Sequence, residues 1–261
     1  MTQFNTGQAV EVATHASLLE EALFQEGRKA AKTQFGKLRL DSDRDLDSEV
    51  AKMVPLLKSD KSDWKLIVTE LQKVQHIAKL VASGDAHFSR GALVGNLGKL
   101  VPCLPVQLLC LRSQVTREAY TSTMMLAEAL GDDFELAAVR LLNKEALVKL
   151  MHSGKSVLAE YGFMSVVGIL HCVCSHKLLQ RLASEMTESR SNSVQEKGAA
   201  VFLFLFLTLY PKDVIKSQAS HLSTYMKHCL ENANVRCREI GRKAFLVWQH
   251  VDKHSANRVF N

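Results

Sequence analysis

The sequence contains few residues that interrupt secondary structure. Only 4 prolines and 13 glycines occur among its 261 residues. An all-β protein of this length needs many more turn residues, so this scarcity favours long helices with few breaks. The length allows one or two domains, or a single helical solenoid, and it is sufficient for a buried core.

Long hydrophobic runs are also absent. The longest, at residues 199–207, stays far short of the roughly 18–20 residues that cross a membrane, even when extended to Leu209. Residues 1–10 lack the basic start and apolar stretch of a secretory signal. The cysteines lie in apolar helical patterns rather than at turns, so we expect reduced core thiols in a cytosolic protein. They are Cys103, Cys110, Cys172, Cys174, Cys229 and Cys237.

The chain does contain a repeat. Four segments begin with a short polar cluster, followed by a valine, charged residues and a long apolar stretch. The valines are Val115, Val157, Val194 and Val235, at spacings of 42, 37 and 41 residues, and a similar segment at 62–81 precedes them. A period of about 40 residues with two helices per unit is typical of HEAT repeats, whose units bury their apolar faces only by stacking. The sequence therefore predicts an all-α fold, an α-solenoid of about six HEAT-like helical repeats.

The repeat also decides the interpretation of residues 201–210, VFLFLFLTLY. Their intrinsic propensity favours a β-strand. A polar capping pattern at 192–195 and the position within the repeat predict a buried helix instead.

The net charge of +6 indicates an acidic partner, and the repeat predicts where the cations lie. Ser113, Ser153, Asn192 and Asn234 occupy the expected N-cap positions of the second helices. Equivalent turns of a solenoid line up along one edge, so we expect the basic residues beside these caps to form a stripe and a binding edge. These residues are Arg112, Arg117, Lys155, Arg190, Lys197, Arg236, Arg238 and Arg242.

Trp64 follows Asp63, an expected N-cap, at the first of these turns. A tryptophan there either packs as core or as a hydrophobic staple, or it stays exposed as a binding anchor. Its position in the sequence leaves both interpretations open.

Two segments resemble parts of nucleotide-binding or metal-binding motifs, but each lacks residues that its motif requires. Residues 154–156 (GKS) resemble the end of a P-loop, but Lys149 stands where that motif needs glycine. Cys172 and Cys174 would point apart on a helix, and no second ligand pair has zinc-finger spacing. No nucleophile–base set or pair of carboxylates is placed together, so the sequence predicts no enzyme, no cofactor and no metal site.

Several segments together resemble a known family. They are Asp63-Trp64 followed by Leu71, and residues 111–119 (LRSQVTREA), 131–135 (GDDFE), 231–236 (ENANVR) and 242–245 (RKAF). With them, residues 45–261 resemble a TOG domain, a flat paddle of HEAT-like repeats that binds tubulin, of the type found in CLASP, the cytoplasmic linker-associated proteins. Residues 1–40 are then expected to be an N-terminal extension, either an extra helix or a linker.

This resemblance implies a site and a function. TOG domains bind the αβ-tubulin heterodimer through their intra-repeat turns, and in CLASP proteins this favours microtubule pause and rescue. The residues at the corresponding turns are Trp64 and Lys65, then Arg112, Ser113 and Gln114, then Lys155, then Ser193 and Lys197, and finally Asn234, Arg236 and Arg238. The family's basic residue three positions after the tryptophan is replaced here by Ile67. The resemblance further implies a monomeric domain on microtubules in the cytoplasm, including those of the spindle or kinetochore, without a membrane partner.

Two other binding functions compete with this one. The first is a HEAT-repeat scaffold that binds a non-tubulin protein. The second is nucleic-acid binding, which the positive charge alone favours equally. Aromatic residues make up only 7% of the chain, and the basic edge has almost none on which bases could stack, so we expect no nucleic-acid partner.

Overall fold

The computed structural model describes residues 38–60, 62–143, 146–189, 191, 194–195, 200–257 and 259, and every regular element in these ranges is a helix. The first helices of the successive repeats are α2 (Asp43–Lys58), α4 (Arg90–Leu100) with α5 (Leu104–Leu108), α7 (Glu135–Leu141) with α8 (Leu147–Met151), α10 (His176–Thr187), and α13 (Lys212–Ser217) with α14 (Ala219–Leu230). The second helices are α3 (Trp64–Ser83), α6 (Ser113–Leu130), α9 (Ser156–Cys172), α12 (Ala200–Leu209) and α15 (Val235–Val251). The remaining elements are the 3-10 helices η1 (Val101–Cys103) and η2 (Gly131–Phe134), and the last helix α16 (Lys253–Asn257).

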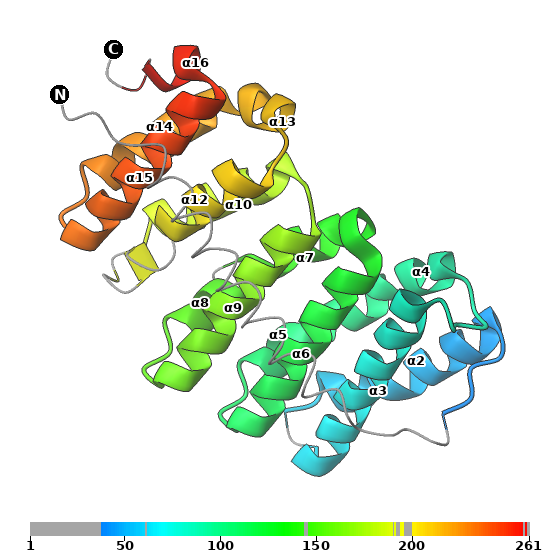
Figure 1. Ribbon diagram of the computed structural model, residues 1–261. Coiled ribbons are helices and arrows are strands. Elements are labelled where there is room, and N and C mark those ends of the chain that lie inside the picture. The colour runs from blue at the N-terminus through cyan, green and yellow to red at the C-terminus, as the bar shows by residue number, and fades with distance from the viewer. Residues whose placement is uncertain are drawn as a thin grey trace.

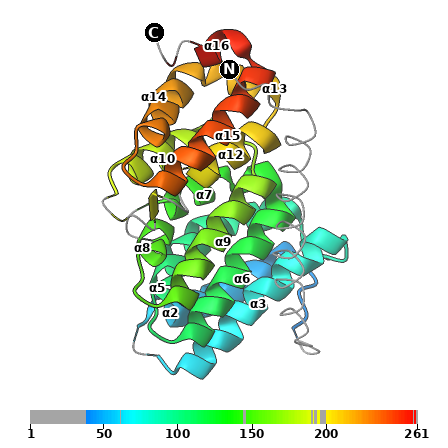
Figure 2. The same cartoon turned by 60° about the vertical axis from the view of Figure 1, so that its left-hand side comes forward.

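The helices form an elongated slab of two layers (Figures 1 and 2). The second helices lie side by side in one layer, where α3 packs against α6, α6 against α9, α9 against α12 and α12 against α15. The first helices form the other layer. This arrangement of helix pairs confirms the predicted all-α solenoid. Of the predicted N-terminal extension, residues 1–37 lie outside the described part of the chain.

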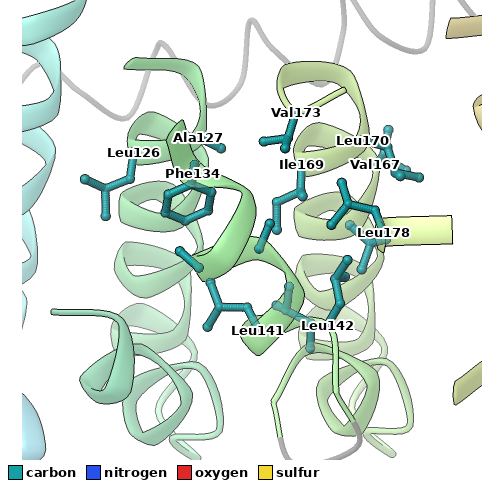
Figure 3. Close-up of a cluster of buried hydrophobic side chains, with 14 of the residues drawn as sticks. Leu126, Ala127, Phe134, Leu141, Leu142, Val167, Ile169, Leu170, Val173 and Leu178 are labelled. Carbon is teal, nitrogen blue, oxygen red and sulfur yellow. The ribbon is translucent and has the colours of Figure 1, made fainter. Parts of the chain in front are cut away.

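A continuous hydrophobic core fills the space between the layers. Figure 3 shows it where the second repeat meets the third: Leu126 of α6, Phe134 of η2 and Ile169 of α9 line this core, and all three are fully buried. Each such side chain contributes roughly 1.5–3 kcal/mol relative to exposure. The contributing residues come from adjacent repeats, so each repeat buries its apolar face only against its neighbours.

Residues 200–209 form α12, so the predicted buried helix is confirmed. Leu203 and Phe206 are buried, and Tyr210 Oη donates to the Val173 carbonyl oxygen at 2.6 Å. Packing in the helical layer overrides the β propensity of this run. No helix in the described ranges, α12 included, is long and apolar enough to cross a membrane.

The valines that revealed the repeat are not equivalent in space. Val115 is the third residue of α6 and is buried. Val157 is the second residue of α9 and Val235 the first of α15, and they are 53% and 57% exposed. A shift of one residue turns a side chain by about 100° around a helix. The spacing therefore detects the repeat, but the second helices begin at different positions relative to these valines.

The prediction that the cysteines lie in helices is confirmed for four of them and is wrong for Cys110, in the turn before α6, and for Cys174. All six cysteines are free, and Cys103, Cys229 and Cys237 are buried. Cys174 instead lies exposed in the loop after α9, because that helix ends at Cys172.

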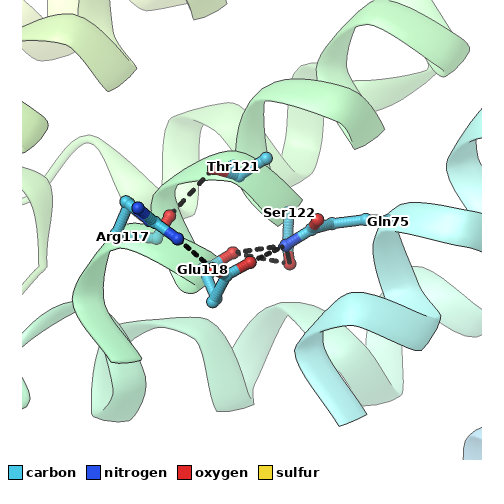
Figure 4. Close-up of polar contacts among 5 residues, drawn as sticks. All are labelled: Gln75, Arg117, Glu118, Thr121 and Ser122. Atoms are coloured by element: carbon cyan, nitrogen blue, oxygen red, sulfur yellow. Dashed lines mark hydrogen bonds and ion pairs between the residues drawn. The ribbon is translucent and has the colours of Figure 1, made fainter. Parts of the chain in front are cut away.

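Buried polar contacts fix how α3 and α6 sit against each other (Figure 4). Gln75 Nε2 of α3 donates to Glu118 Oε2 of α6 at 2.9 Å, and Ser122 Oγ donates to the Leu71 carbonyl oxygen at 3.0 Å. Arg117 forms an ion pair with the other carboxylate oxygen of Glu118, which is only 2% exposed. Because a buried polar group without a partner is costly, these contacts select one alignment of the two helices.

Two glycine positions allow a stability test. A Cβ at Gly95, inside α4, would meet no atom within 4 Å, whereas at Gly162, inside α9, it would lie 2.8 Å from the Met151 backbone nitrogen. We expect Gly95→Ala to raise the free energy of unfolding by about 0.5–1 kcal/mol, since alanine is the better helix former. Gly162→Ala should lower it, because the backbone of α8 must move. Urea denaturation measures both, and equal effects of the two substitutions would contradict this packing.

Candidate functional site

All the second helices run in the same direction, so their N-terminal ends lie on one edge of the slab. In Figure 1 the starts of α3, α6, α9 and α15 follow one another along the lower left side. We name this the turn edge. It comprises the intra-repeat turns, residues 59–60 with 62–63, 109–112, 152–155 and 231–234, together with the first helical turn that follows each.

The outer two turns have side-chain caps. Asp63 Oδ1 accepts from the Lys65 backbone N–H at 3.0 Å, and Asn234 Oδ1 accepts from the Arg236 and Cys237 N–H groups at 2.9 and 3.4 Å. Both were predicted as N-caps, and both are confirmed. Each cap satisfies helix N–H groups that have no partner within the helix.

The middle two turns are different. The N-cap positions of α6 and α9 are occupied by Arg112 and Lys155, and neither helix has a side-chain cap. The prediction that Ser113 caps α6 is wrong, since Ser113 is the first helical residue. Ser153 does not cap α9 either, because its hydroxyl accepts from the N–H of the N-cap residue itself, at 3.3 Å.

Trp64 is neither wholly core nor a free anchor. Its ring is half-buried against the core, and its outer side carries two cations. The Arg112 guanidinium carbon lies 5.4 Å from the ring centre and Lys65 Nζ lies 5.9 Å from it, both within cation–π range. The first turn is thereby joined to the second. Ile67 stands where TOG domains have a basic residue three positions after the tryptophan. It is only 3% exposed, so its side chain faces the core.

The second turn is joined to the third in a similar way. Lys155 Nζ donates to the Leu111 carbonyl oxygen at 3.3 Å. Arg112 and Lys155 are both exposed, so these contacts fix the turns while leaving the charges at the surface. The two predicted site residues beside Arg112, Ser113 and Gln114, are exposed at the start of α6.

At the last turn the predicted cations divide into two kinds. Arg238 Nη1 donates to the Asn232 and Ala233 carbonyl oxygens at 2.6 and 2.8 Å, so its side chain holds the turn that Asn234 caps. Arg236 is exposed at the second position of α15. Four predicted residues of the fourth turn, Arg190, Asn192, Ser193 and Lys197, lie outside the described residues.

The sequence analysis missed a second component of the turn edge, its exposed apolar side chains. Leu66 is 50% exposed and Leu111 is 79% exposed, and Val157 and Val235 lie on the same edge. The exposure of Val157 could have been predicted in part from the sequence. Leu158 and Gly162, four residues apart, lie on the buried face of α9, and Val157 does not lie on that face. The turn edge therefore combines cations with apolar groups.

Metal ligands are not assembled in the described part of the chain. No three His, Cys, Asp or Glu side chains there are placed to hold a metal ion. Burial raises the pKa of the Cys172 thiol to about 12, so this thiol is protonated at neutral pH and a poor nucleophile. The arrangement of the turn edge suits binding to another surface.

Comparison with known proteins identifies related chains. The family described as CLASP N terminal matches residues 46–261. "Protein CLASP-2" of Caenorhabditis briggsae is 26% identical over 224 residues, which cover 86% of this chain and 27% of that protein. "CLIP-associating protein 1" of Xenopus tropicalis is 24% identical over 224 residues, which cover 86% of this chain and 15% of that protein. The chain thus spans a minor part of the length of these relatives.

Two solved structures have the same fold. The MAST/Orbit N-terminal domain has a TM-score of 0.52 at 13% identity, over 77% of this chain and 83% of that one. A structure described as "Crescerin uses a TOG domain array to regulate microtubules in the primary cilium" has a TM-score of 0.51 at 18% identity, over 73% of this chain and 78% of that one. At these identities the likeness concerns the fold alone.

The contact between the first two turns can be tested by a double-mutant cycle on stability. Trp64→Leu keeps an apolar side chain but removes the aromatic face, and Arg112→Ala removes the cation. Because exposed cation–π pairs are worth about 0.5–1 kcal/mol, we expect a coupling of that size between the two substitutions. Denaturation of the four proteins of the cycle in urea measures it. Additive effects would show that Arg112 does not stabilise the first turn through Trp64.

Proposed function

Because the chain belongs to the CLASP N-terminal family, we propose that it is a tubulin-binding TOG domain that acts through its turn edge. Binding of the αβ-tubulin heterodimer there would regulate microtubule dynamics by favouring pause and rescue. The domain needs no catalytic step for this activity, and no cofactor.

One observation carries the proposal. Exposed cations from turns that are far apart in the sequence lie on a single edge, and side-chain contacts hold three of these turns relative to one another. A partner surface therefore meets a preformed row of contacts, which lowers the entropy cost of binding.

The residues proposed to form the tubulin-binding surface have distinct parts in it. Trp64 supports the first turn, with Lys65 and Arg112 over its ring. Asn234 and Arg238 hold the last turn, beside the exposed Arg236. The full proposed set is Trp64, Lys65, Arg112, Ser113, Gln114, Lys155, Ser193, Lys197, Asn234, Arg236 and Arg238, of which Ser193 and Lys197 lie outside the described residues.

Charge supports an acidic protein as the partner. The chain has a net charge of +6, and Lys65, Arg112, Lys155 and Arg236 are exposed at four successive described turns. Complementary charge raises the association rate and sets orientation more than it raises affinity. A row of cations along one edge would therefore orient an acidic partner relative to the domain. We place the protein on microtubules in the cytoplasm, including those of the spindle or kinetochore, and propose that the isolated domain is a monomer.

The proposal predicts that Arg236→Ala weakens tubulin binding without unfolding the chain. Arg236 is exposed, so helical content by circular dichroism should be unchanged. The Kd for αβ-tubulin should rise about tenfold, which corresponds to about 1.4 kcal/mol. Size exclusion and fluorescence titration with purified tubulin measure the effect.

Lys79→Ala is the matched control, because Lys79 is also an exposed cation but lies near the opposite end of α3. It removes the same charge away from the turn edge and should leave the Kd unchanged. If the unaltered chain does not co-elute with tubulin at micromolar concentration, the proposed function is wrong. A partner other than tubulin, bound without regard to the turn residues, would instead support a HEAT-repeat scaffold.

A further inference from the structure

Exposed apolar side chains are concentrated on the turn edge. Among the described residues, the most exposed large hydrophobic side chains are Leu66, Val106, Leu111, Leu136, Val157, Val235 and Leu246, and four of these seven belong to the turn edge. Single exposed apolar residues are ordinary on protein surfaces and need no explanation. Their recurrence at the start of α3, α6, α9 and α15 does need one, because burial in the core requires none of them.

Leu111 is the most exposed of the seven, at 79%. At this exposure its side chain contributes little to folding. The turn around it is nevertheless held at three consecutive residues, two through backbone carbonyl oxygens and one through a side chain. The Cys110 carbonyl oxygen accepts from Thr116 Oγ1 at 2.8 Å, the Leu111 carbonyl oxygen accepts from Lys155 Nζ at 3.3 Å, and the Arg112 guanidinium lies over the Trp64 ring.

These three contacts come from different repeats. Thr116 belongs to α6 itself, Lys155 to the following repeat and Trp64 to the preceding one. The turn is thereby fixed from both sides while the leucine side chain points into solvent. A rigid exposed apolar group loses little conformational freedom on binding, which is a property of residues that dominate binding energy.

From this geometry we infer that Leu111 is the apolar anchor of the turn edge, and that Lys155 is a positioning residue that acts through Leu111. The inference deepens the proposed function and rests on it. The partner surface it requires has an apolar depression for Leu111 with an acidic group beside it, because the exposed Arg112 is next to that residue. On the proposed function, the αβ-tubulin heterodimer presents this surface.

Leu111→Ser tests the anchor, with Leu136→Ser as the matched control. Leu136 is 68% exposed at the second position of α7, beyond the inter-repeat turn formed by η2, so the same substitution is made at a similar exposure away from the turn edge. Titration of the chain with purified αβ-tubulin should show a rise in Kd of about tenfold or more for Leu111→Ser, as for a buried interface anchor, and no change for Leu136→Ser.

Salt separates the apolar contribution from the charged one. Ionic screening weakens contacts between exposed charges but acts little on apolar burial. The fold-change caused by Leu111→Ser should therefore be equal at low and high salt, whereas the fold-change caused by Arg236→Ala should shrink at high salt. A Kd of Leu111→Ser equal to that of Leu136→Ser, or a Leu111→Ser effect that disappears with added salt, would overturn the inference.

A second cycle tests the role of Lys155. Lys155→Met keeps the aliphatic chain and removes the ammonium group, and Lys155→Arg restores a donor. If Lys155 acts by holding Leu111, then Lys155→Met weakens tubulin binding, Lys155→Arg restores much of it, and Lys155→Met has little further effect in a chain that already carries Leu111→Ser. Additive effects of Lys155→Met and Leu111→Ser would show that Lys155 contacts the partner independently, which overturns its assignment as a positioning residue.

Failure of the proposed function is distinguishable from failure of this inference. If the unaltered chain does not bind tubulin, the proposed function and this inference are both wrong. If the unaltered chain binds and Arg236→Ala weakens that binding while Leu111→Ser does not, the proposed function stands and the anchor assigned to Leu111 is wrong.

Discussion

No repeat of this chain can bury its own apolar face, and the rest of the structure follows from that constraint. Two helices form only one face of a core, so each pair packs against the next and the core runs through the whole slab. Polar contacts also link adjacent repeats, between residues about one repeat length apart in the sequence. The hydrogen bonds from Gln75 to Glu118, from Asn96 to Asp47 and from Arg181 to the Leu142 carbonyl link residues 43, 49 and 39 positions apart. Apolar burial drives the stacking, and these directional contacts select its alignment.

Stacking also creates the candidate site. Successive second helices are parallel, so turns some forty residues apart in the sequence become neighbours on one edge. Some residues at this edge, such as Leu111 and Arg112, face solvent, so the core places no demand on their side chains. At the two middle turns the N-cap residues are Arg112 and Lys155, although Ser, Asp or Asn stabilise a helix more at that position.

The sequence predicted the helical class, the repeat and the edge, because each of these depends on periodicity or on composition. It predicted Asp63 and Asn234 as caps, because capping is a local interaction with a strong residue preference. It did not predict the different exposures of Val115, Val157 and Val235, because the second helices start at slightly different points of each repeat. The contacts of Arg112 with Trp64 and of Lys155 with Leu111 could not be predicted, since they join residues of different repeats and depend on the three-dimensional packing.

The cations of the turn edge therefore combine two physical roles. A guanidinium over an indole ring, or an ammonium group bonded to a carbonyl oxygen, keeps its full charge while its side chain loses freedom. For the proposed acidic partner, the long-range attraction is thus retained, and the local contacts would place the turns before that partner binds. Exposed cations alone would give attraction without a defined fit, because such contacts are weak and screened by salt. In the proposed binding, the exposed apolar side chains of the turn edge would supply short-range contacts that depend on shape, so orientation and adhesion would come from different groups on the same edge.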